Sequence, residues 1–395
     1  MTTDTTLSRP DLVDACVPLA AGQPTHVVRH QRTKVASATQ ASHDGLFSPA
    51  VAGIGVDERL AAALLACRLS QAPALAAHYR GALLDQGGDA AAWVAAIDAG
   101  QWQARLPPRL ATILGFTAKL IERPIEGDRA AAQALLQAGL TVPACVALAQ
   151  LIAFLSYQVR LVAGLQAMVA AEAGGAAPPA APAQGQVPDQ QGAGSLAPSP
   201  LRINGFTDES LPWAPWLDTV QLEDATPEQL AALDEMSPTA RQQPYFLLLA
   251  HQPEILLHRS VAFNAIMFAP GGLPRAEREL GATVESRLNG CVYCTAVHAQ
   301  RFAQLAKRND VIAQLFQDPA TAGTSARERA LVGFSSVLAQ RPHQLAATDV
   351  QALAAVGLAP LEVLDLVHAV ALFAWANRLM LNLGEPVLPW AAAAS

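Results

Sequence analysis

Residues 289–298 read Asn-Gly-Cys-Val-Tyr-Cys-Thr-Ala-Val-His and are the most informative stretch of this chain. Cys291, Cys294 and His298 stand at positions i, i+3 and i+7, which share one face of an α-helix. Asn289-Gly290 is a typical turn and cap, so a helix is expected to begin near Cys291. Both thiols would then lie near the positive end of that helix, where a thiol pKa is expected to fall.

Two further residues complete the expected chemistry. His298, one turn after Cys294, can accept a thiol proton, and Glu279, twelve residues before Cys291, adds a carboxylate. A CxxC pair with a base and an acid predicts reversible dithiol–disulfide chemistry. Two alternatives remain at this point: a zinc site made by the two thiols, His298 and a fourth ligand, or a pair of buried, inert cysteines.

The composition favours an all-α protein. The chain has 395 residues, enough for two domains, and is 52% hydrophobic but only 5% aromatic. Much of the hydrophobic content is alanine, and no segment shows sustained period-two alternation. The expected helices are 57–69, 127–139, 145–170, 227–236, 241–252, 274–288, 291–307, 326–340, 348–356 and 361–381.

Charge and cysteine usage exclude several classes of protein. The net charge of −7 and a pI near 5.7 argue against nucleic acid as a partner. Three of the five cysteines are isolated, unlike a secreted disulfide framework. The first residues lack the pattern of a signal peptide, and the apolar stretches 142–169 and 358–383 are interrupted by polar residues. We therefore expect a cytoplasmic protein that does not span a membrane.

The chain divides into two halves. Residues 172–200 are rich in Ala, Pro, Gly and Gln without periodicity, which is typical of a flexible linker. We expect one domain at 1–171 and another at 201–395. Segment 115–124 (Gly-Phe-Thr-Ala-Lys-Leu-Ile-Glu-Arg-Pro) is similar to segment 333–342 (Gly-Phe-Ser-Ser-Val-Leu-Ala-Gln-Arg-Pro), which indicates an internal duplication.

The duplication is chemically unequal. A Phe-x-Pro motif precedes Glu58 by eleven residues, as one precedes Glu279, so Glu58 is the expected counterpart of Glu279 and His78 that of His298. Whichever register is used, no cysteine stands opposite the CxxC pair; the residues there are Ser70 and Pro73, or Gln71 and Ala74. The first half is expected to be a silent copy. Alternatively, Glu58 and His78 are only a helix-start acid and a surface histidine.

Several other residues have structural expectations. Trp213 and Trp216 are expected to anchor the segment that leads into the second domain, and Tyr245 and Phe246 to lie in its core. His368 stands on an apolar helix and is expected to be a core histidine or to line the pocket. Asn377-Arg378 is expected to cap or salt-link the contact between the domains.

The second half resembles a known family. Segment 268–280 (Phe-Ala-Pro-Gly-Gly-Leu-Pro-Arg-Ala-Glu-Arg-Glu-Leu), the CxxC segment 289–298 and the closing segment 373–386 resemble the alkylhydroperoxidase D-like branch of the carboxymuconolactone decarboxylase family. The resemblance covers about 205–388. It extends more weakly to about 25–168, as a copy without the CxxC pair.

This resemblance implies an all-α fold, oligomers and antioxidant peroxidase or disulfide-reductase activity. It implies that Cys294 is the peroxidatic cysteine, Cys291 the resolving cysteine, His298 the base and Glu279 the carboxylate of a proton relay. The founding peroxidase has a histidine directly before its second cysteine, where this chain has Tyr293.

Tyr293 and Glu285 are therefore additional candidates for the relay, since Glu285 lies closer than Glu279 to Cys291 in the sequence. The expected function is a thiol-dependent alkyl hydroperoxide reductase that needs no metal or organic cofactor. Its expected partners are a hydroperoxide and a thiol or lipoyl-type reductant protein, and its expected assembly is a homo-oligomer such as a trimer. The alternatives are a redox sensor or scaffold, and a decarboxylase or isomerase of the same family.

Overall fold

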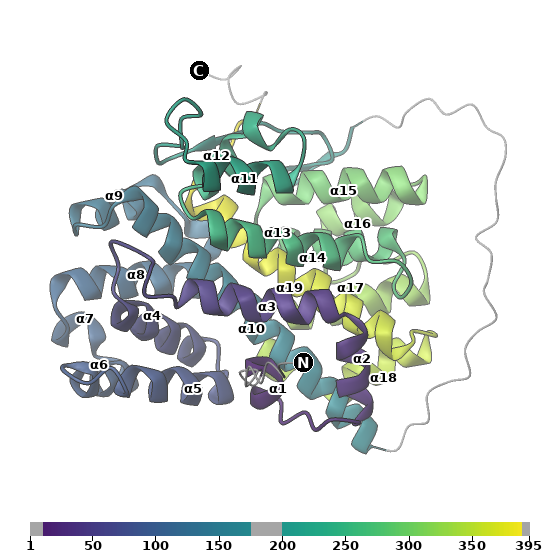
Figure 1. The fold of residues 1–395 in the computed structure, drawn as a ribbon. Coiled ribbons are helices and arrows are strands. Elements are labelled where there is room, and N and C mark those ends of the chain that lie inside the picture. Colours follow the sequence, from purple (N-terminus) through teal and green to yellow (C-terminus); the bar gives the residue numbers. More distant parts are fainter. Residues whose placement is uncertain (1–10, 175–199, 389–395) are drawn as a thin grey trace, which may run out of the picture.

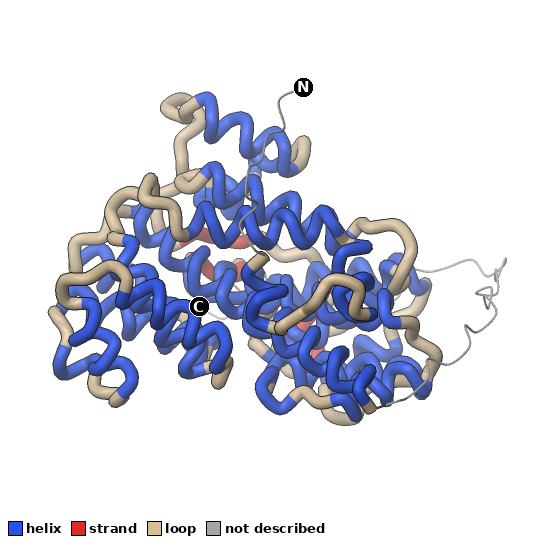
Figure 2. The backbone as a smooth tube through the Cα atoms, turned by 60° about the horizontal axis from the view of Figure 1, so that its bottom comes forward, coloured by secondary structure: helices blue, strands red, loops and turns tan. Residues whose placement is uncertain are grey.

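The computed structural model describes residues 11–174 and 200–388. Within these ranges the chain forms nineteen α-helices and four strands of two or three residues, so the all-α expectation is confirmed (Figure 2). Most of the expected linker, 172–200, lies outside the described residues, although α10 extends to Ala173.

The first half contains ten helices. They are α1 (Leu12–Cys16), α2 (Pro24–Gln31), α3 (Thr33–Leu46), α4 (Val56–Leu69), α5 (Pro73–Leu84), α6 (Ala90–Asp98), α7 (Trp102–Arg105), α8 (Pro108–Glu122), α9 (Arg129–Gln137) and α10 (Val142–Ala173), with a 3-10 turn η1 (Pro124–Glu126).

The second half begins with three strands, β1 (Arg202–Ile203), β2 (Phe206–Thr207) and β3 (Trp213–Pro215), and ends with β4 (Gly384–Pro386). Its helices are α11 (Pro227–Met236), α12 (Pro244–Leu249), α13 (Pro253–Met267), α14 (Arg275–Leu288), α15 (Val292–Ala306), α16 (Asp310–Gln317), α17 (Ala326–Gln340), α18 (Ala347–Ala355) and α19 (Pro360–Asn382), with 3-10 turns η2 (Ala240–Gln242) and η3 (Pro342–Gln344).

The helices of the two halves follow the same order. Helices α3, α4, α5, α6, α8, α9 and α10 precede α13, α14, α15, α16, α17, α18 and α19, respectively, by a nearly constant interval in the numbering. Both α10 and α19 have a proline in their first two positions, because its fixed φ suits the start of a helix. This repeated order is what an internal duplication would produce.

One expected helix, 241–252, is divided in the structure. A 3-10 turn ends at Gln242, α12 begins at Pro244 and ends at Leu249, and α13 begins at Pro253. Each proline begins a helix because it lacks the N–H that a helix interior requires.

Trp213 anchors the start of the second domain as expected. Its strand β3 pairs with β4 in an antiparallel arrangement, with Trp213 opposite Pro386. The indole Nε1–H donates to the Met380 carbonyl at 3.1 Å, and its ring meets Tyr245 edge to face. The strand pair therefore fixes the entering segment against the end of α19.

Helices α10 and α19 pack against each other in the middle of the molecule (Figure 1). Figure 1 shows α4 to α9 on one side of this pair and α15 to α18 on the other. Both central helices are long and apolar enough to cross a membrane, but both are almost completely buried inside the protein. Such burial is what core helices of a soluble protein show.

Two arginines cross between the halves in a reciprocal way. Arg160 of α10 donates to the Ala339 carbonyl at 2.5 Å, and Arg378 of α19 donates to the Ile121 carbonyl at 3.4 Å. Arg378 follows Arg160 in the sequence by the same number of residues as Ala339 follows Ile121. Each contact is therefore the duplicate of the other. The contact thus uses the same surface of each half, as in an isologous dimer interface. Arg378 lies at this contact as expected, but it reaches the other half through a hydrogen bond to a carbonyl rather than a salt link.

A second reciprocal pair lies deeper between α10 and α19. Trp375 Nε1–H donates to Gln150 Oε1 at 2.9 Å, and Tyr157 Oη lies 3.4 Å from His368 Nδ1. Trp375 and Tyr157 occupy equivalent places in the two halves, as do His368 and Gln150. His368 is therefore a core histidine with a partner, and it is absent from the lining of the cavity described below.

Burial lowers the pKa of His368 to about 3, and the positive charges of nearby arginines act in the same direction. An unfolded chain restores the ordinary pKa near 6.5. The unfolded state therefore binds more protons than the folded state between these two values, and stability is lost as the pH falls below about 6.5.

We predict that lowering the pH from 7 to 5 costs the wild type about 2 kcal/mol through this one side chain. The variant His368→Gln should abolish this contribution to the loss of stability. Glutamine is chosen because Gln150 occupies the equivalent position in the first half. Urea unfolding at both pH values measures the difference, with the more exposed His258→Gln as control. An equal loss in the wild type and His368→Gln would contradict the assignment.

Candidate active site

The turn between α14 and α15 places both thiols. The Cys291 N–H donates to the Ser286 carbonyl at 2.9 Å, and Gly290 has a φ of 72°, a conformation that favours glycine. A Cβ at Gly290 would also lie only 2.3 Å from the side chain of Ile125 in the first half. Cys291 is consequently the N-cap residue of α15, and Cys294 lies in its first turn, close to the expected helix start.

The two thiols have different surroundings. Cys294 lines a cavity of about 300 Å³, whereas Cys291 does not line it and is only 1% exposed. Burial, followed by a hydrogen bond with Cys294, raises the pKa of Cys291 well above its usual value. The lowered pKa expected for a thiol at this helix start is therefore wrong for Cys291, since desolvation outweighs the helix dipole.

Behind Cys294, a histidine and a carboxylate are hydrogen-bonded. His298 Nδ1 lies 2.5 Å from Glu279 Oε2, and Arg275 Nε donates to Glu279 Oε1 at 2.6 Å. Burial alone would raise the pKa of Glu279, but the charge of His298 and the bonds from His298 and Arg275 outweigh it and lower that pKa. An ionised Glu279 fixes the proton of His298 on Nδ1, so Nε2 is the nitrogen left to exchange a proton.

The sequence missed Arg275 and Phe373 as members of this site. Arg275 stands one turn before Glu279 on α14, a spacing that predicts an ion pair. Phe373 of α19 meets the ring of His298 edge to face, with ring centroids 4.0 Å apart. No local signal in the sequence indicated this second contact, because the two residues stand on helices that are far apart in the chain.

The two additional relay candidates lie in different places. Tyr293 lines the cavity together with Cys294, and burial raises the pKa of its phenol. Glu285 instead accepts a hydrogen bond from Asn289 at 2.7 Å and lies 3.4 Å from Arg160 of the first half. Glu285 therefore belongs to the contact between the halves and is absent from the cavity lining.

The cavity has an apolar wall and a few polar groups. Its lining comes from α11 to α13, α15, α19 and neighbouring loops: Met236, Ser237, Gln243, Tyr245, Phe246, Arg259, Phe263, Asn264, Phe268, Tyr293, Cys294, Val297, His298, Phe373, Ala376 and Met380. Tyr245, expected in the core, is buried and is also part of this wall. The arrangement can hold a small, largely apolar molecule against the Cys294 thiol.

The structure corrects the counterpart of Glu279 in the first half. Glu58 binds Arg109 at 2.7 Å just as Glu277 binds Arg327 at 2.7 Å. Glu58 therefore corresponds to Glu277. The equivalent of Glu279 is two residues further on, at Leu60.

The counterparts of the other site residues are corrected as well. The Ala72 N–H donates to the carbonyl five residues earlier at 2.9 Å, as the Cys291 N–H does, and Gln71 has the positive φ found at Gly290. In this register Ala72, Leu75 and Tyr79 take the places of Cys291, Cys294 and His298. His78 lines a different cavity in the first half but is not the counterpart of His298. No thiol, imidazole or carboxylate stands at these equivalent positions.

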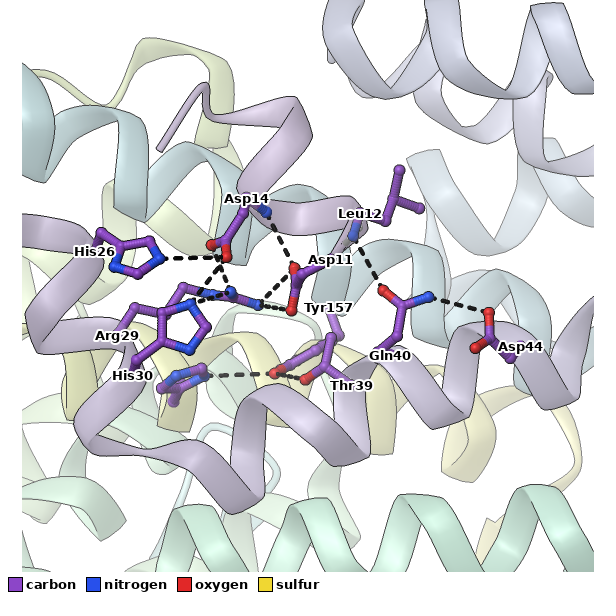
Figure 3. Close-up of polar contacts among 11 residues, drawn as sticks. Asp11, Leu12, Asp14, His26, Arg29, His30, Thr39, Gln40, Asp44 and Tyr157 are labelled. Atoms are coloured by element: carbon purple, nitrogen blue, oxygen red, sulfur yellow. Dashed lines mark hydrogen bonds and ion pairs between the residues drawn. The ribbon is translucent and has the colours of Figure 1, made fainter. Parts of the chain in front are cut away.

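One group of side chains has the composition of a metal site. Figure 3 shows His26 and His30 of α2 directed at Asp14 of α1, and their ligand atoms all lie within 4.8 Å of one another. Asp14 is already engaged by His30 at 2.8 Å and by Arg29 at 2.5 Å. Within the part of the chain that the structure describes, the dithiol pair and its histidine form no such group, which disfavours the zinc alternative for the CxxC.

Comparison with known proteins points to one family. Residues 256–336 match the model of the carboxymuconolactone decarboxylase family. One similar solved structure is described as an alkylhydroperoxidase AhpD core, an uncharacterized peroxidase-related protein from Ralstonia eutropha JMP134. It is 26% identical with a TM-score of 0.37, and the match covers 41% of this chain and 86% of that one. No protein of curated function matches the chain.

The matched segment contains α14, α15 and most of α17, and with them Glu279, both cysteines of the CxxC pair and His298. The part of the chain that carries the dithiol site is therefore the part that matches the model of the carboxymuconolactone decarboxylase family.

Proposed function

We propose that this protein is a thiol-dependent reductase of organic hydroperoxides. The observation that carries the proposal is the unequal placement of the two thiols. Cys294 reaches the cavity beside His298, while Cys291 is buried next to it. One thiol can thus meet a substrate, and the other can only react with its neighbour.

In the first step the Cys294 thiol transfers its proton to Nε2 of His298, and the thiolate attacks one oxygen of the hydroperoxide. An S–O bond forms and the O–O bond breaks, which leaves a sulfenic acid on Cys294 and an alkoxide. His298 returns a proton to the alkoxide, giving an alcohol. Glu279 holds the imidazole in the required tautomer and stabilises its charged form.

In the second step the sulfur of Cys291 attacks the sulfenic sulfur of Cys294. A disulfide forms, and the sulfenic oxygen leaves as water with the proton of Cys291. The raised pKa of Cys291 suits this order, because Cys291 stays protonated while Cys294 reacts. Two electrons from an external dithiol then restore both thiols.

The remaining functional expectations stay part of this proposal. They are a dithiol or lipoyl-type reductant protein, no metal or organic cofactor in the reaction, a cytoplasmic location and a homo-oligomer of two-domain chains. The first half would serve as a packing partner of the active half, since Leu60, Ala72, Leu75 and Tyr79 supply none of the reacting groups.

We predict that Cys294→Ser abolishes reductant-coupled hydroperoxide consumption, because no nucleophile remains in the cavity. Cys291→Ser should still consume about one equivalent of hydroperoxide per chain and accumulate a sulfenic acid on Cys294. Mass spectrometry after dimedone labelling locates the modified cysteine. A sulfenic acid on Cys291 in the Cys294→Ser variant would contradict the assigned roles, and an oxidised pair without turnover would favour a redox sensor.

A second prediction concerns the proton relay. Glu279→Gln keeps the shape of the side chain but removes the charge that supports a protonated His298, so kcat/KM should fall roughly 10²-fold. Glu277→Gln on the same helix is the matched control, because that carboxylate binds Arg327 outside the cavity. Steady-state assays measure kcat/KM of the two variants. An equal loss of kcat/KM in both would contradict a role of Glu279 in the relay.

A further inference from the structure

Arg259 of α13 is a buried cation in the lining of the candidate site. Its side chain is 3% exposed and lines the same cavity as Cys294. Among the described residues, no hydrogen bond or ion pair engages its guanidinium, and its Nε atom is buried without a partner. Its recorded contacts are with ring faces: the guanidinium carbon lies 5.6 Å from the ring centroid of Tyr245 and 5.9 Å from that of Trp375.

Each of the other buried arginines of the described chain donates at least one hydrogen bond from a terminal nitrogen, although the Nε atoms of Arg29, Arg160, Arg278 and Arg378 also lack a partner. Arg278 donates to Asp365 at 2.9 Å and to three backbone carbonyls, and Arg160 donates to two carbonyls. Arg29, Arg59 and Arg378 likewise donate to carboxylates or carbonyls. Arg259 differs from these arginines because its terminal nitrogens also have no acceptor among the described residues.

A second donor, in a residue that lines the cavity, has no hydrogen-bond partner among the described residues. The hydroxyl of Tyr245 is buried without a hydrogen bond, and Tyr245 also belongs to the cavity lining. A buried guanidinium and a buried phenol O–H each cost free energy when no acceptor meets them. Two such donors beside one cavity indicate a ligand that brings an acceptor with negative charge.

We propose that the cavity binds the carboxylate of an acidic hydroperoxide, with Arg259 and Tyr245 as its donors. One guanidinium balances one negative charge, and a carboxylate offers one oxygen to each donor. The apolar wall, which includes Phe263 and Phe373, then holds a hydrocarbon chain that brings the hydroperoxide to Cys294. This substrate class rests on the proposed peroxidase function.

The size of the cavity restricts the chain length. Ligand cavities commonly span roughly 300–1,000 Å³, and this one, at about 300 Å³, is at the lower limit. A medium-chain hydroperoxy acid therefore fits the cavity better than a long-chain one.

The first test measures binding without catalysis. Octanoate and octanol are titrated into the reduced wild type, Arg259→Met, Arg259→Lys and Tyr245→Phe by calorimetry. We expect octanoate to bind the wild type at least tenfold more tightly than octanol does, and Arg259→Met to lose that preference. Arg259→Lys should retain part of it, and Tyr245→Phe should weaken octanoate alone. Arg301→Met, at an exposed position of α15, is the control.

The second test measures turnover of a medium-chain hydroperoxy acid and of its methyl ester. The wild type should favour the acid at least tenfold in kcat/KM, and Arg259→Met should reduce this ratio to about one. Circular dichroism of each variant confirms that it is folded.

The outcomes separate the two proposals. Equal binding of octanoate and octanol by the wild type, or an unchanged preference in Arg259→Met, would overturn the anion site even if the enzyme reduces hydroperoxides. Arg259-dependent binding of octanoate without turnover of either hydroperoxide would support the anion site and overturn the peroxidase function.

Discussion

The structure depends on the mutual burial of α10 and α19. Both helices are apolar on nearly all sides, so neither could be exposed to water without losing the hydrophobic free energy of a whole helix surface. Each half supplies one of them, and each covers the other. The reciprocal bonds of Arg160 and Arg378 add direction to this contact, because each guanidinium satisfies a carbonyl at a helix end of the opposite half.

This central contact also fixes the candidate site. The same α19 that packs on α10 carries Phe373, which holds the ring of His298, while Ile125 of the first half leaves room for nothing larger than glycine at position 290. The first half thus supports the geometry of the dithiol turn without supplying a reacting group. One copy in a duplicated chain can lose its reacting residues and keep its packing surface, because the reaction and the packing depend on different residues.

The sequence predicted the all-α fold and the grouping of the site residues because both rest on local patterns. The spacing of Cys291, Cys294 and His298 requires only one helix, and the structure contains that helix. The register of the silent copy was wrong because it relied on the Phe-x-Pro motif, whereas the loop between that motif and the next helix is two residues longer in the first half. The lack of hydrogen-bond partners at Arg259 and Tyr245 could not be predicted from the sequence, because it depends on which residues lie next to them in the folded structure.

The difference between local sequence pattern and three-dimensional surroundings also explains why the two thiols differ. Both stand at the start of α15, so the helix dipole, commonly worth about 0.3–1 kcal/mol, acts on both. Full burial of a thiolate costs more than that, and Cys291 is completely enclosed, whereas Cys294 opens on the cavity. Surroundings rather than helix position therefore separate the thiol that opens on the cavity from the enclosed one.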